Sequence, residues 1–462
     1  MDLIDELRAA VGDEHVLVDD DVRAGYERDW TGRFVGRADA VVRPASTDEV
    51  SRVVSACARH RVPIVPQGGN TGLVGGSVPG DGGVVVSLTR LGAVTDVDPV
   101  AGQLTAGAGV TLAAVHEAAR AAGWAYGVDF AARDTATVGG MVATNAGGHH
   151  VVRHGATRRQ LLGVEAVLAD GQVVSRLGGL VKDNTGYDLA GLVCGSEGTL
   201  AIVTAARLAL VAPARDRVTA LVGFATGARA VAALGPLRLG VRGLEAAELM
   251  LADGLDLVAG HLGAPHPFAR PSASNRRRID ADVRAVLLVE AAGGNADEEL
   301  AAALDGLEVV GEPLVALDAP RRAELWRWRD AHTEAIATLG APHKLDVTLP
   351  TAALAPALDE LPRLVTELRP GARTWIFGHA GDGNLHVNVT GLDPDDDAVD
   401  AAILRAVAGW GGSISAEHGI GRAKVAYLHL SRSPAEIDAF RRIKAALDPT
   451  GVLNPGVLLA PR

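Results

Sequence analysis

The chain has 462 residues, of which 48% are hydrophobic and 22% are charged, and its formal net charge at pH 7 is −12. This length can bury a large core and favours two or three domains. The acidic balance, without a basic run that contains interleaved aromatic residues, argues against a nucleic-acid-binding surface. The single basic cluster, Arg276-Arg277-Arg278, is interpreted as a solvated loop edge.

The N-terminus is acidic and lacks the basic start and apolar core of a signal peptide. The apolar stretch Val218–Leu237 is interrupted by an arginine and a proline, so it does not predict a transmembrane helix. Cys57 and Cys194 lie outside any Cys-x-x-Cys pair and are predicted to be small core residues in a reducing compartment. The sequence therefore predicts a cytoplasmic protein without an integral membrane segment.

The first elements form an α/β pattern. A short helix is predicted at Leu3–Val11, within a lead-in over residues 1–39 that carries no recognisable chemistry. A strand at Val41–Pro44 is followed by an amphipathic helix at Asp48–His60, for which Ser46 or Thr47 offers an N-cap.

The next strand, Val62–Pro66, leads directly into a glycine-rich loop, Gln67–Ser77. Backbone N–H groups of such a loop can approach and cradle a pyrophosphate, although glycine-rich loops also occur as plain turns. The chain contains neither a P-loop motif nor Gly-x-Gly-x-x-Gly. A nucleotide here would therefore not be held in the P-loop or Rossmann manner.

Further strands and helices continue the pattern. We predict a strand at Val84–Leu88, a helix at Leu112–Ala122, and a strand at Leu162–Asp170 that ends in an Asp170-Gly171 hairpin. Between them, Thr135–Gly148 is a long run of small side chains. Such a run indicates backbone packed against something bulky and flat.

From Pro213 to about Pro370 the composition becomes rich in alanine and leucine, and helices alternate with strands such as Ala285–Glu290. Residues 260–280 are predicted to form a surface loop. A helix is predicted over Asp318–Leu339, capped by Asp318. Within it, Arg329 and Thr333 are four residues apart and would be neighbours on one face.

Two histidines flank a tight acidic turn in Gly378–Asn388. Alternating side chains before and after Asp382-Gly383 predict two paired strands, on which His379 and His386 can converge on one ion. Glu417, in a second glycine-bounded motif, would complete a His₂Glu set. That set suits zinc or a neighbouring divalent metal and leaves a coordination position open for substrate. Each of these residues taken singly would be read as an ordinary core or surface residue.

Several ordered motifs resemble the FAD-binding domain of the vanillyl-alcohol-oxidase type, also called the PCMH type. They are Pro66–Ser77, Val138–Gly140 with Thr144–Gly148, Lys182–Tyr187 and Gly195–Val203. The motifs His379–His386 and Glu417–Gly421 resemble the FAD-linked D-2-hydroxyacid dehydrogenases of that superfamily, closest to the D-2-hydroxyglutarate dehydrogenases. The likeness extends from about Ala40 to Pro455.

This resemblance implies an α+β protein with four parts. Residues 1–39 would be the lead-in, and residues 40–213 would form a PCMH-type FAD-binding domain of two α/β subdomains. Residues 214–430 would form an α+β cap that carries the metal motifs and binds substrate. Residues 431–462 would return to the flavin.

The resemblance also implies which residues line a noncovalently bound FAD, because nothing near Gln67–Asn70 resembles the flavin-linking residue of some relatives. The implied residues are Gln67, Gly68, Gly69, Asn70, Thr71, Gly72, Gly76, Ser77, Thr137, Gly140, Asn145, Gly148, Glu197, Ile202 and Asn454.

By the same resemblance, the implied reaction is oxidation of D-2-hydroxyglutarate to 2-oxoglutarate, with hydride transfer from C2 to flavin N5. The metal would lower the pKa of the substrate hydroxyl, and His418 would accept its proton. Asn388 would orient the substrate. The distal carboxylate would be held by Arg329, Thr333 and Lys344, whose guanidinium, hydroxyl and ammonium groups suit an anion.

Three alternatives stay open at this point. The substrate could be D-lactate or glycolate with the same chemistry, the His₂Glu set could belong to a metal-dependent hydrolase without flavin, or the chain could be a noncatalytic flavoprotein subunit. The expected partners are the small-molecule hydroxyacid and a separate electron acceptor, either a quinone or an electron-transfer flavoprotein. No nucleic acid is expected, and a homodimer is compatible with the family.

Overall fold

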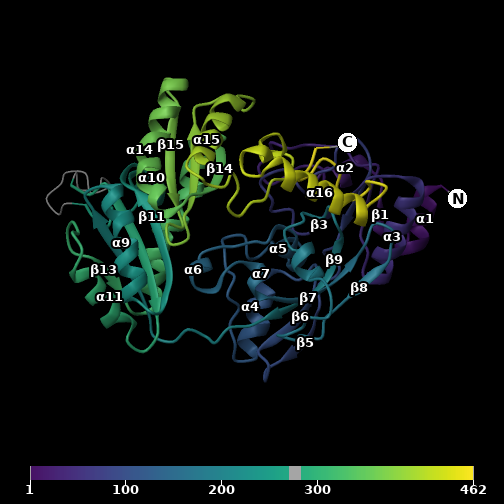
Figure 1. The fold of residues 1–462 in the computed structure, drawn as a ribbon, viewed down its shortest axis with the longest axis horizontal. Coiled ribbons are helices and arrows are strands. Elements are labelled where there is room, and N and C mark those ends of the chain that lie inside the picture. The colour runs from purple at the N-terminus through teal and green to yellow at the C-terminus, as the bar shows by residue number, and fades with distance from the viewer. Residues whose placement is uncertain (1, 270–281, 461–462) are drawn as a thin grey trace. The chain divides into compact units, whose positions relative to one another are not determined.

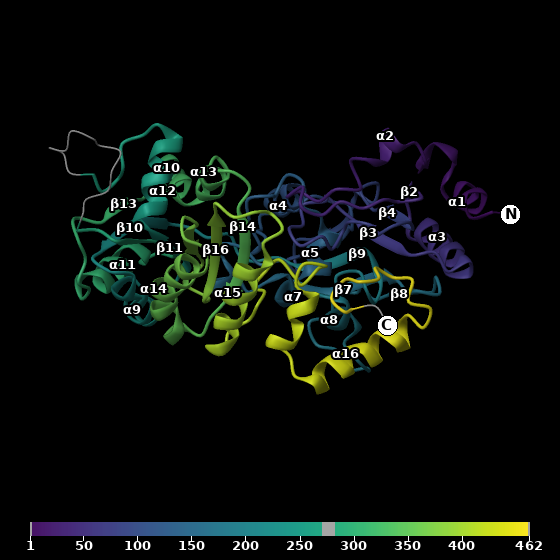
Figure 2. The same ribbon diagram turned by 90° about the horizontal axis from the view of Figure 1, so that it is seen from above.

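A computed structural model gives the fold, and it describes residues 2–269 and 282–460 (Figures 1 and 2). The chain forms two compact units. The first unit comprises Met1–Gly148, His154–Pro213 and Glu417–Arg462, and the second comprises His149–Arg153 and Ala214–Ala416. The domain limits drawn from the sequence stay predictions.

A four-stranded sheet forms the N-terminal part of the first unit, in the order β1-β2-β4-β3. Its strands are β1 (Val16–Leu17), β2 (Ala40–Val42), β3 (Ile64–Gln67) and β4 (Val84–Ser87), and β2 and β3 both pair parallel with β4. Helices α1 (Leu3–Val11) and α3 (Thr47–His60) lie side by side against it (Figure 1). The predicted cap of α3 is confirmed, because the Ser46 hydroxyl accepts a hydrogen bond from the N–H of Glu49.

A five-stranded antiparallel sheet forms the other part of the first unit, in the order β5-β6-β9-β7-β8. The predicted hairpin is confirmed, because β7 and β8 pair and Gly171 takes a φ of 88° between them. Its strands are β5 (Val94–Asp98), β6 (Gln103–Gly107), β7 (Leu161–Val167), β8 (Val173–Ser175) and β9 (Ile202–Ala209).

Short helices connect these strands. They are η1 (Asp13–His15), α2 (Asp20–Arg23), α4 (Leu112–Ala121), α5 (Val138–Thr144), α6 (Val151–His154), α7 (Thr157–Gln160) and α8 (Leu189–Val193). The small-residue run is thus partly helical, since α5 lies within it. Cys57 and Cys194 are both buried, as predicted.

The C-terminal segment, yellow in Figure 1, packs back onto the first unit. It contains η2 (Val425–Leu430) and α16 (Pro434–Leu447). Leu453 pairs in parallel with Ile64 of β3. The ammonium of Lys444 donates to the carbonyl oxygens of Thr199 and Leu453, each at 2.7 Å. These bonds join the end of the chain to the glycine-rich part of the unit.

A seven-stranded, wholly antiparallel sheet forms the centre of the second unit, in the order β13-β10-β12-β11-β15-β16-β14. Its strands are β10 (Arg217–Phe224), β11 (Leu244–Leu251), β12 (Ala285–Ala292), β13 (Leu314–Ala316), β14 (His343–Thr348), β15 (Arg373–Gly378) and β16 (Asn384–Thr390). The predicted strand pair around Asp382-Gly383 is confirmed as β15 and β16, and Gly383 has a φ of 89°.

Helices cover both faces of this sheet (Figure 2). One face is covered by α9 (Gly227–Gly240), α11 (Ala296–Asp305), α14 (Thr351–Leu368) and α15 (Asp397–Gly409). The other is covered by α10 (Ala252–Leu262), α12 (Ala319–Asp330) and α13 (His332–Ala337). We call this second face the polar face, because several charged and imidazole side chains lie on it.

The strand register places four of those side chains and the amide side chain of Asn388. Residues directly opposite each other in a sheet share a face, and side chains alternate between faces along a strand. Asp346 is opposite His386 and Lys344 is opposite Asn388. Phe377 is opposite both His386 and Met250, and Met250 follows Glu248 by two residues. All of these side chains therefore point to the polar face.

The prediction of one continuous helix over Asp318–Leu339 is wrong. The N-cap at Asp318 is confirmed, but the helix is interrupted at Ala331 and continues as α13. The physical reason is a competing side chain, because Nδ1 of His332 lies 3.0 Å from the carbonyl oxygen of Trp328 and 3.1 Å from that of Arg329. Arg329 and Thr333 consequently belong to two helices.

Two further expectations concern loops and membranes. Most of the predicted surface loop 260–280, including the arginine triplet, lies outside the described residues, and its first residues belong to α10. Among the helices of the described part of the chain, none has the length and apolar character needed to cross a membrane.

Candidate functional site

The glycine-rich loop after β3 runs close to the small-residue run. A Cβ atom on Gly69 would lie 1.8 Å from the carbonyl oxygen of Thr135, and one on Gly68 would lie 2.2 Å from Oγ1 of Thr137. Real Cβ contacts are never this short, so only glycine allows the two segments to meet. The structure thus brings together Gly68, Gly69 and Thr137, three of the residues that the resemblance assigns to FAD.

Four of the assigned FAD residues have the left-handed backbone that non-glycine residues rarely adopt. The φ angles are 53° at Asn70, Asn145 and Glu197 and 43° at Asn454. Backbone strain of this kind persists only where the surrounding structure enforces it, and it concentrates at ligand-binding sites.

Asn454, in the C-terminal segment, connects two parts of this region. Its Nδ2 donates to the carbonyl oxygens of Gly76 and Glu197 at 2.9 and 2.7 Å. The Glu197 carboxylate in turn accepts the N–H groups of Ile420 and Gly421 at 2.9 and 2.7 Å. Burial raises the pKa of Glu197, and these two N–H groups oppose that effect. Glu197 therefore holds the loop that begins at Glu417.

This region fits a bound FAD. Thr137 Oγ1, Ser196 Oγ and Asn454 Oδ1 are buried and have no hydrogen-bond partner within residues 2–269 and 282–460. Buried polar groups are normally paired, so these atoms indicate a missing polar ligand. Other assigned residues have partners within the unit: Gln67 Nε2 donates to the carbonyl oxygens of Tyr26 and Ser77, and Asn70 Oδ1 accepts from Ser77 Oγ.

The remaining assigned residues lie around the same loops. Ile202 is fully buried at the start of β9. Gly140 lies within α5, and Asn145 forms the C-cap of that helix. The N–H of Gly148 donates to Oε1 of Glu417 at 2.9 Å, so a predicted cofactor residue and a predicted metal ligand are in contact within the first unit. His418 is the next residue of the same loop and is half-buried.

In the second unit, the two histidines of the β15–β16 hairpin face each other. Their Nε2 atoms lie 3.4 Å apart. Two nitrogen ligands of one tetrahedral zinc ion, each about 2.05 Å from it, are separated by about 3.3 Å. The spacing of His379 and His386 therefore fits two ligands of a single metal ion.

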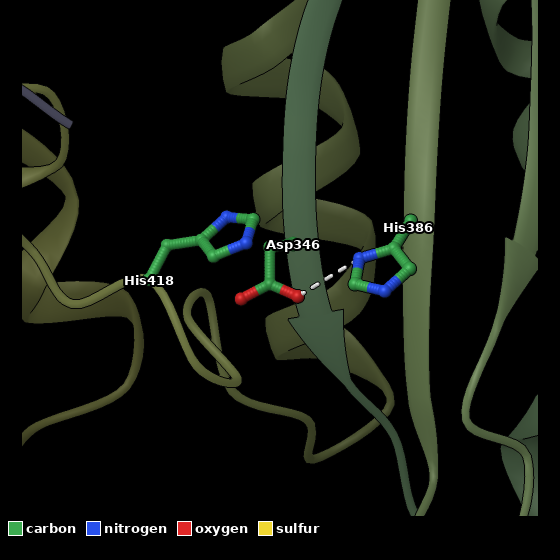
Figure 3. Close-up of side chains that lie close together, drawn as sticks. All are labelled: Asp346, His386 and His418. Atoms are coloured by element: carbon green, nitrogen blue, oxygen red, sulfur yellow. Dashed lines mark ion pairs between the residues drawn. The ribbon is translucent and has the colours of Figure 1, made fainter. Parts of the chain in front are cut away.

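A carboxylate contacts the Nδ1 atom of each imidazole, whereas the two Nε2 atoms face each other. Glu248 Oε1 lies 2.7 Å from Nδ1 of His379, and Asp346 Oδ1 lies 3.3 Å from Nδ1 of His386. Figure 3 shows the second pair, with Asp346 and His386 on neighbouring strands. Metal-binding histidines usually donate their second ring N–H to a carboxylate, which fixes the tautomer and orients the other nitrogen.

The protonation of His386 agrees with a ligand role. Burial lowers its pKa, and Asp346 only partly opposes that effect. The imidazole is therefore neutral near pH 7, and a neutral imidazole is the form that binds a metal.

Four predicted site residues belong to the same unit as this pair. Arg329, on α12, is buried, its Nε donates to Glu248 Oε2 at 2.7 Å, and its Nη2 lies 3.3 Å from His379 Nε2. Lys344 and Asn388 are directly opposite on β14 and β16. Burial lowers the pKa of Lys344, and Nδ2 of Asn388 is buried without a hydrogen-bond partner among the described residues. Thr333, on α13, is half-buried.

Sequence reasoning missed the supporting residues. Glu248 and Asp346 are each 1% exposed, and His149 lies with its ring centroid 5.8 Å from that of His379. A signal for Glu248 was present, because an acidic residue within the apolar strand Leu244–Leu251 must have a charged partner when buried.

Acidification is expected to destabilise the second unit through His332. Burial lowers its pKa to about 3, and the charge of Arg329 adds to the effect. In the unfolded chain an imidazole titrates near pH ~6.5. Between these values only the unfolded state binds the proton, so stability falls as the pH drops, by roughly 3 kcal/mol at pH 4 for this residue.

Urea unfolding of the wild type and of His332→Gln at pH 7 and pH 4 measures this effect. Glutamine can donate to the same two carbonyl oxygens but does not titrate. The variant should therefore lose less stability between the two pH values. Equal losses in both proteins would show that His332 does not contribute.

Comparison with known families and structures gives a consistent result. A model of the C-terminal domain of FAD-linked oxidases matches residues 213–458, and a model of an FAD binding domain matches residues 38–176. Two solved structures with 18–19% identity share the fold: p-cresol methylhydroxylase, with a TM-score of 0.79 over 98% of this chain and 95% of that one, and 4-ethylphenol oxidase from Gulosibacter chungangensis, with 0.77 over 99% and 96%. The predicted PCMH-type α+β fold is thereby confirmed.

Several curated proteins are similar over nearly the whole chain. The D-2-hydroxyglutarate dehydrogenase of Xanthomonas citri pv. viticola is 39% identical over 449 residues, which cover 94% of this chain and 92% of that protein. The mitochondrial D-2-hydroxyglutarate dehydrogenase of Danio rerio is 34% identical, over 95% and 82%. A D-2-hydroxyglutarate–pyruvate transhydrogenase of Saccharomyces cerevisiae is 33% identical, over 94% and 88%.

Proposed function

The chain belongs to the FAD-linked oxidase family and is an FAD-linked D-2-hydroxyacid dehydrogenase, and from this premise we propose that it oxidises D-2-hydroxyglutarate to 2-oxoglutarate. Membership in this family removes the alternative of a metal-dependent hydrolase without flavin. The observation that carries the substrate proposal is the polar face of the second unit, where Arg329, Lys344 and Asn388 lie close to the facing imidazoles of His379 and His386.

This arrangement suits a dicarboxylate that carries a hydroxyl group. The side chains of Arg329 and Lys344 would bind the distal carboxylate, with Thr333 as an additional hydroxyl donor. The Asn388 amide would donate to the substrate, which would give its buried Nδ2 the partner that it lacks among the described residues. D-lactate has no distal carboxylate and could not make these contacts with Arg329 and Lys344.

His379, His386 and Glu417 would hold a divalent metal, with zinc as the proposed ion. A bound metal would supply a Lewis acid that lowers the pKa of the substrate hydroxyl. The first two ligands have the required spacing. The proposal takes Glu417 from the first unit as the third ligand, because a carboxylate completes a three-residue set that leaves one position open.

His418 would accept the proton of the substrate hydroxyl, since an imidazole titrates in the right pH range. The substrate then loses its C2–H bond and its O–H bond and gains a C2=O double bond. FAD, held noncovalently by the assigned residues of the first unit, would supply the acceptor for the C2 hydride at N5. The buried Thr137 Oγ1 and Asn454 Oδ1, which have no hydrogen-bond partner in the described part of the chain, support this placement of the cofactor.

An anaerobic visible titration of the purified protein tests the substrate proposal. D-2-hydroxyglutarate is expected to bleach the flavin absorbance at a much lower concentration than D-lactate, because only the dicarboxylate engages Arg329 and Lys344. Preferential bleaching by D-lactate or glycolate would keep the flavin chemistry but contradict the carboxylate pocket. A protein whose flavin is reduced by none of them would support the noncatalytic alternative.

The proposal also covers the cellular location, the electron acceptor and the oligomeric state. We expect a cytoplasmic location, a quinone or an electron-transfer flavoprotein as the separate electron acceptor, and a homodimer. The relative from Danio rerio is named as mitochondrial, so cell fractionation is the direct test of location. Sedimentation of the purified chain tests the dimer.

A further inference from the structure

Glu248 lies at the centre of the polar face. It belongs to β11, the strand that pairs with β15 immediately before His379. Its side chain is 1% exposed, and no reaction step proposed above uses it. A carboxylate at such a buried position is costly unless every oxygen has a partner.

The two oxygens of Glu248 have different partners. Oε1 lies 2.7 Å from Nδ1 of His379, and Oε2 lies 2.7 Å from Nε of Arg329. One carboxylate thus connects a proposed metal ligand with a proposed substrate-binding residue.

Each contact fixes the orientation of its partner. The 2.7 Å contact directs the Nδ1 side of the His379 ring to Glu248, so Nε2 is the ring nitrogen that faces His386, 3.4 Å from its Nε2. The contact to Nε holds Arg329 by one edge of the guanidinium, and its Nη2 lies 3.3 Å from Nε2 of His379. A planar guanidinium that is held in this way loses little freedom when it binds a carboxylate.

We propose that Glu248 is a positioning residue that aligns the metal-binding imidazole of His379 and the substrate-binding guanidinium of Arg329 at the same time. The inference rests on the proposed function, since it assigns Glu248 to the metal and carboxylate sites named there. It makes two separable claims, one on metal affinity and one on the affinity for the distal carboxylate.

A purely structural ion pair exists in the same unit and provides a matched control. Asp400 Oδ1 lies 2.9 Å from Nδ1 of His343, and Nε2 of that imidazole lies 3.0 Å from the carbonyl oxygen of Asp393. Both nitrogens of His343 are thus used within the fold. Asp400→Asn replaces a carboxylate that contacts a buried imidazole, as Glu248→Gln does. It does so at a place where no metal or substrate is proposed to bind.

The experiment compares wild type, Glu248→Gln and Asp400→Asn. Zinc binding to metal-stripped protein, measured by calorimetry, should weaken by about 10- to 100-fold in Glu248→Gln and remain unchanged in Asp400→Asn. In steady-state assays of the reloaded enzyme, KM for D-2-hydroxyglutarate should rise more in Glu248→Gln than KM for D-lactate. Zinc affinity and KM values equal to those of Asp400→Asn would overturn the proposal.

A second set of variants separates the two claims. They are Arg329→Met and the double variant Arg329→Met/Glu248→Gln. Only the double variant removes both buried charges, so it avoids an unpaired charge if a single variant folds poorly. In the Arg329→Met background, Glu248→Gln should still weaken zinc binding but should no longer change KM for D-2-hydroxyglutarate. Additive KM effects would overturn the claim that Glu248 acts through Arg329.

The wild-type measurements distinguish this proposal from the proposed function. If wild type binds no zinc, both the metal assignment and the claim on His379 fail together. If wild type binds zinc and its flavin is reduced by D-2-hydroxyglutarate, but Glu248→Gln behaves like the control, only the positioning role fails.

Discussion

Dialysis of the purified enzyme against a chelator is expected to slow flavin reduction by D-2-hydroxyglutarate by roughly 1,000-fold, because Lewis-acid activation of the hydroxyl supplies several kcal/mol. FAD should stay bound, since its assigned residues lie in the first unit, whereas His379 and His386 lie in the second. Anaerobic stopped-flow measurement of flavin absorbance, with the bound FAD quantified separately, gives both quantities.

Two controls make this result specific. Added zinc should restore the rate in stripped wild type. It should not do so in His386→Ala, which lacks one of the two nitrogens that face each other at 3.4 Å. Flavin reduction at the full rate in stripped protein would show that any bound metal is structural.

Replacement of Arg329 by lysine is expected to lower kcat/KM for D-2-hydroxyglutarate by about 100-fold, with a much smaller loss for D-lactate. The positive charge remains, but lysine lacks the planar fork that binds a carboxylate through two parallel hydrogen bonds. Steady-state kinetics with an artificial electron acceptor on both substrates measure the difference. Equal losses on the two substrates would contradict the role of Arg329 in specificity.

The matched control is Arg327→Lys, because Arg327 lies on the same helix but is exposed. This variant should leave kcat/KM unchanged for both D-2-hydroxyglutarate and D-lactate. Arg329→Ala provides the stability measurement: it leaves the buried Glu248 without its cation, which typically costs about 3–5 kcal/mol. Chemical unfolding should therefore show a large loss of stability for alanine and a smaller one for lysine.

The sequence by itself determined those structural features that depend only on residues close together in the chain. Asp382-Gly383 predicted the turn between β15 and β16, because glycine accepts the positive φ that the turn requires. The same local chemistry identified the glycine-rich loop before Ser77 and the N-cap at Ser46. The family resemblance then supplied the fold class and the FAD-linked dehydrogenase activity, which the comparisons confirm.

The helical pattern gave a wrong prediction where a side chain competes with the backbone for hydrogen bonds. The residues of Asp318–Leu339 favour one helix, and the spacing of Arg329 and Thr333 depended on that expectation. The imidazole of His332 instead approaches the carbonyl oxygens of Trp328 and Arg329, and the helix is interrupted at Ala331. Helical periodicity does not indicate where a side chain will make such a bond.

Only the tertiary structure decided which residues support the candidate site. Glu248 is 131 positions away from His379 in the chain, and Asp346 meets His386 only because β14 pairs with β16 in one particular register. The spacing of residues along the chain carries no information on such contacts. They arise when strands from distant segments join one sheet, and burial then forces each carboxylate to find a cation or an imidazole.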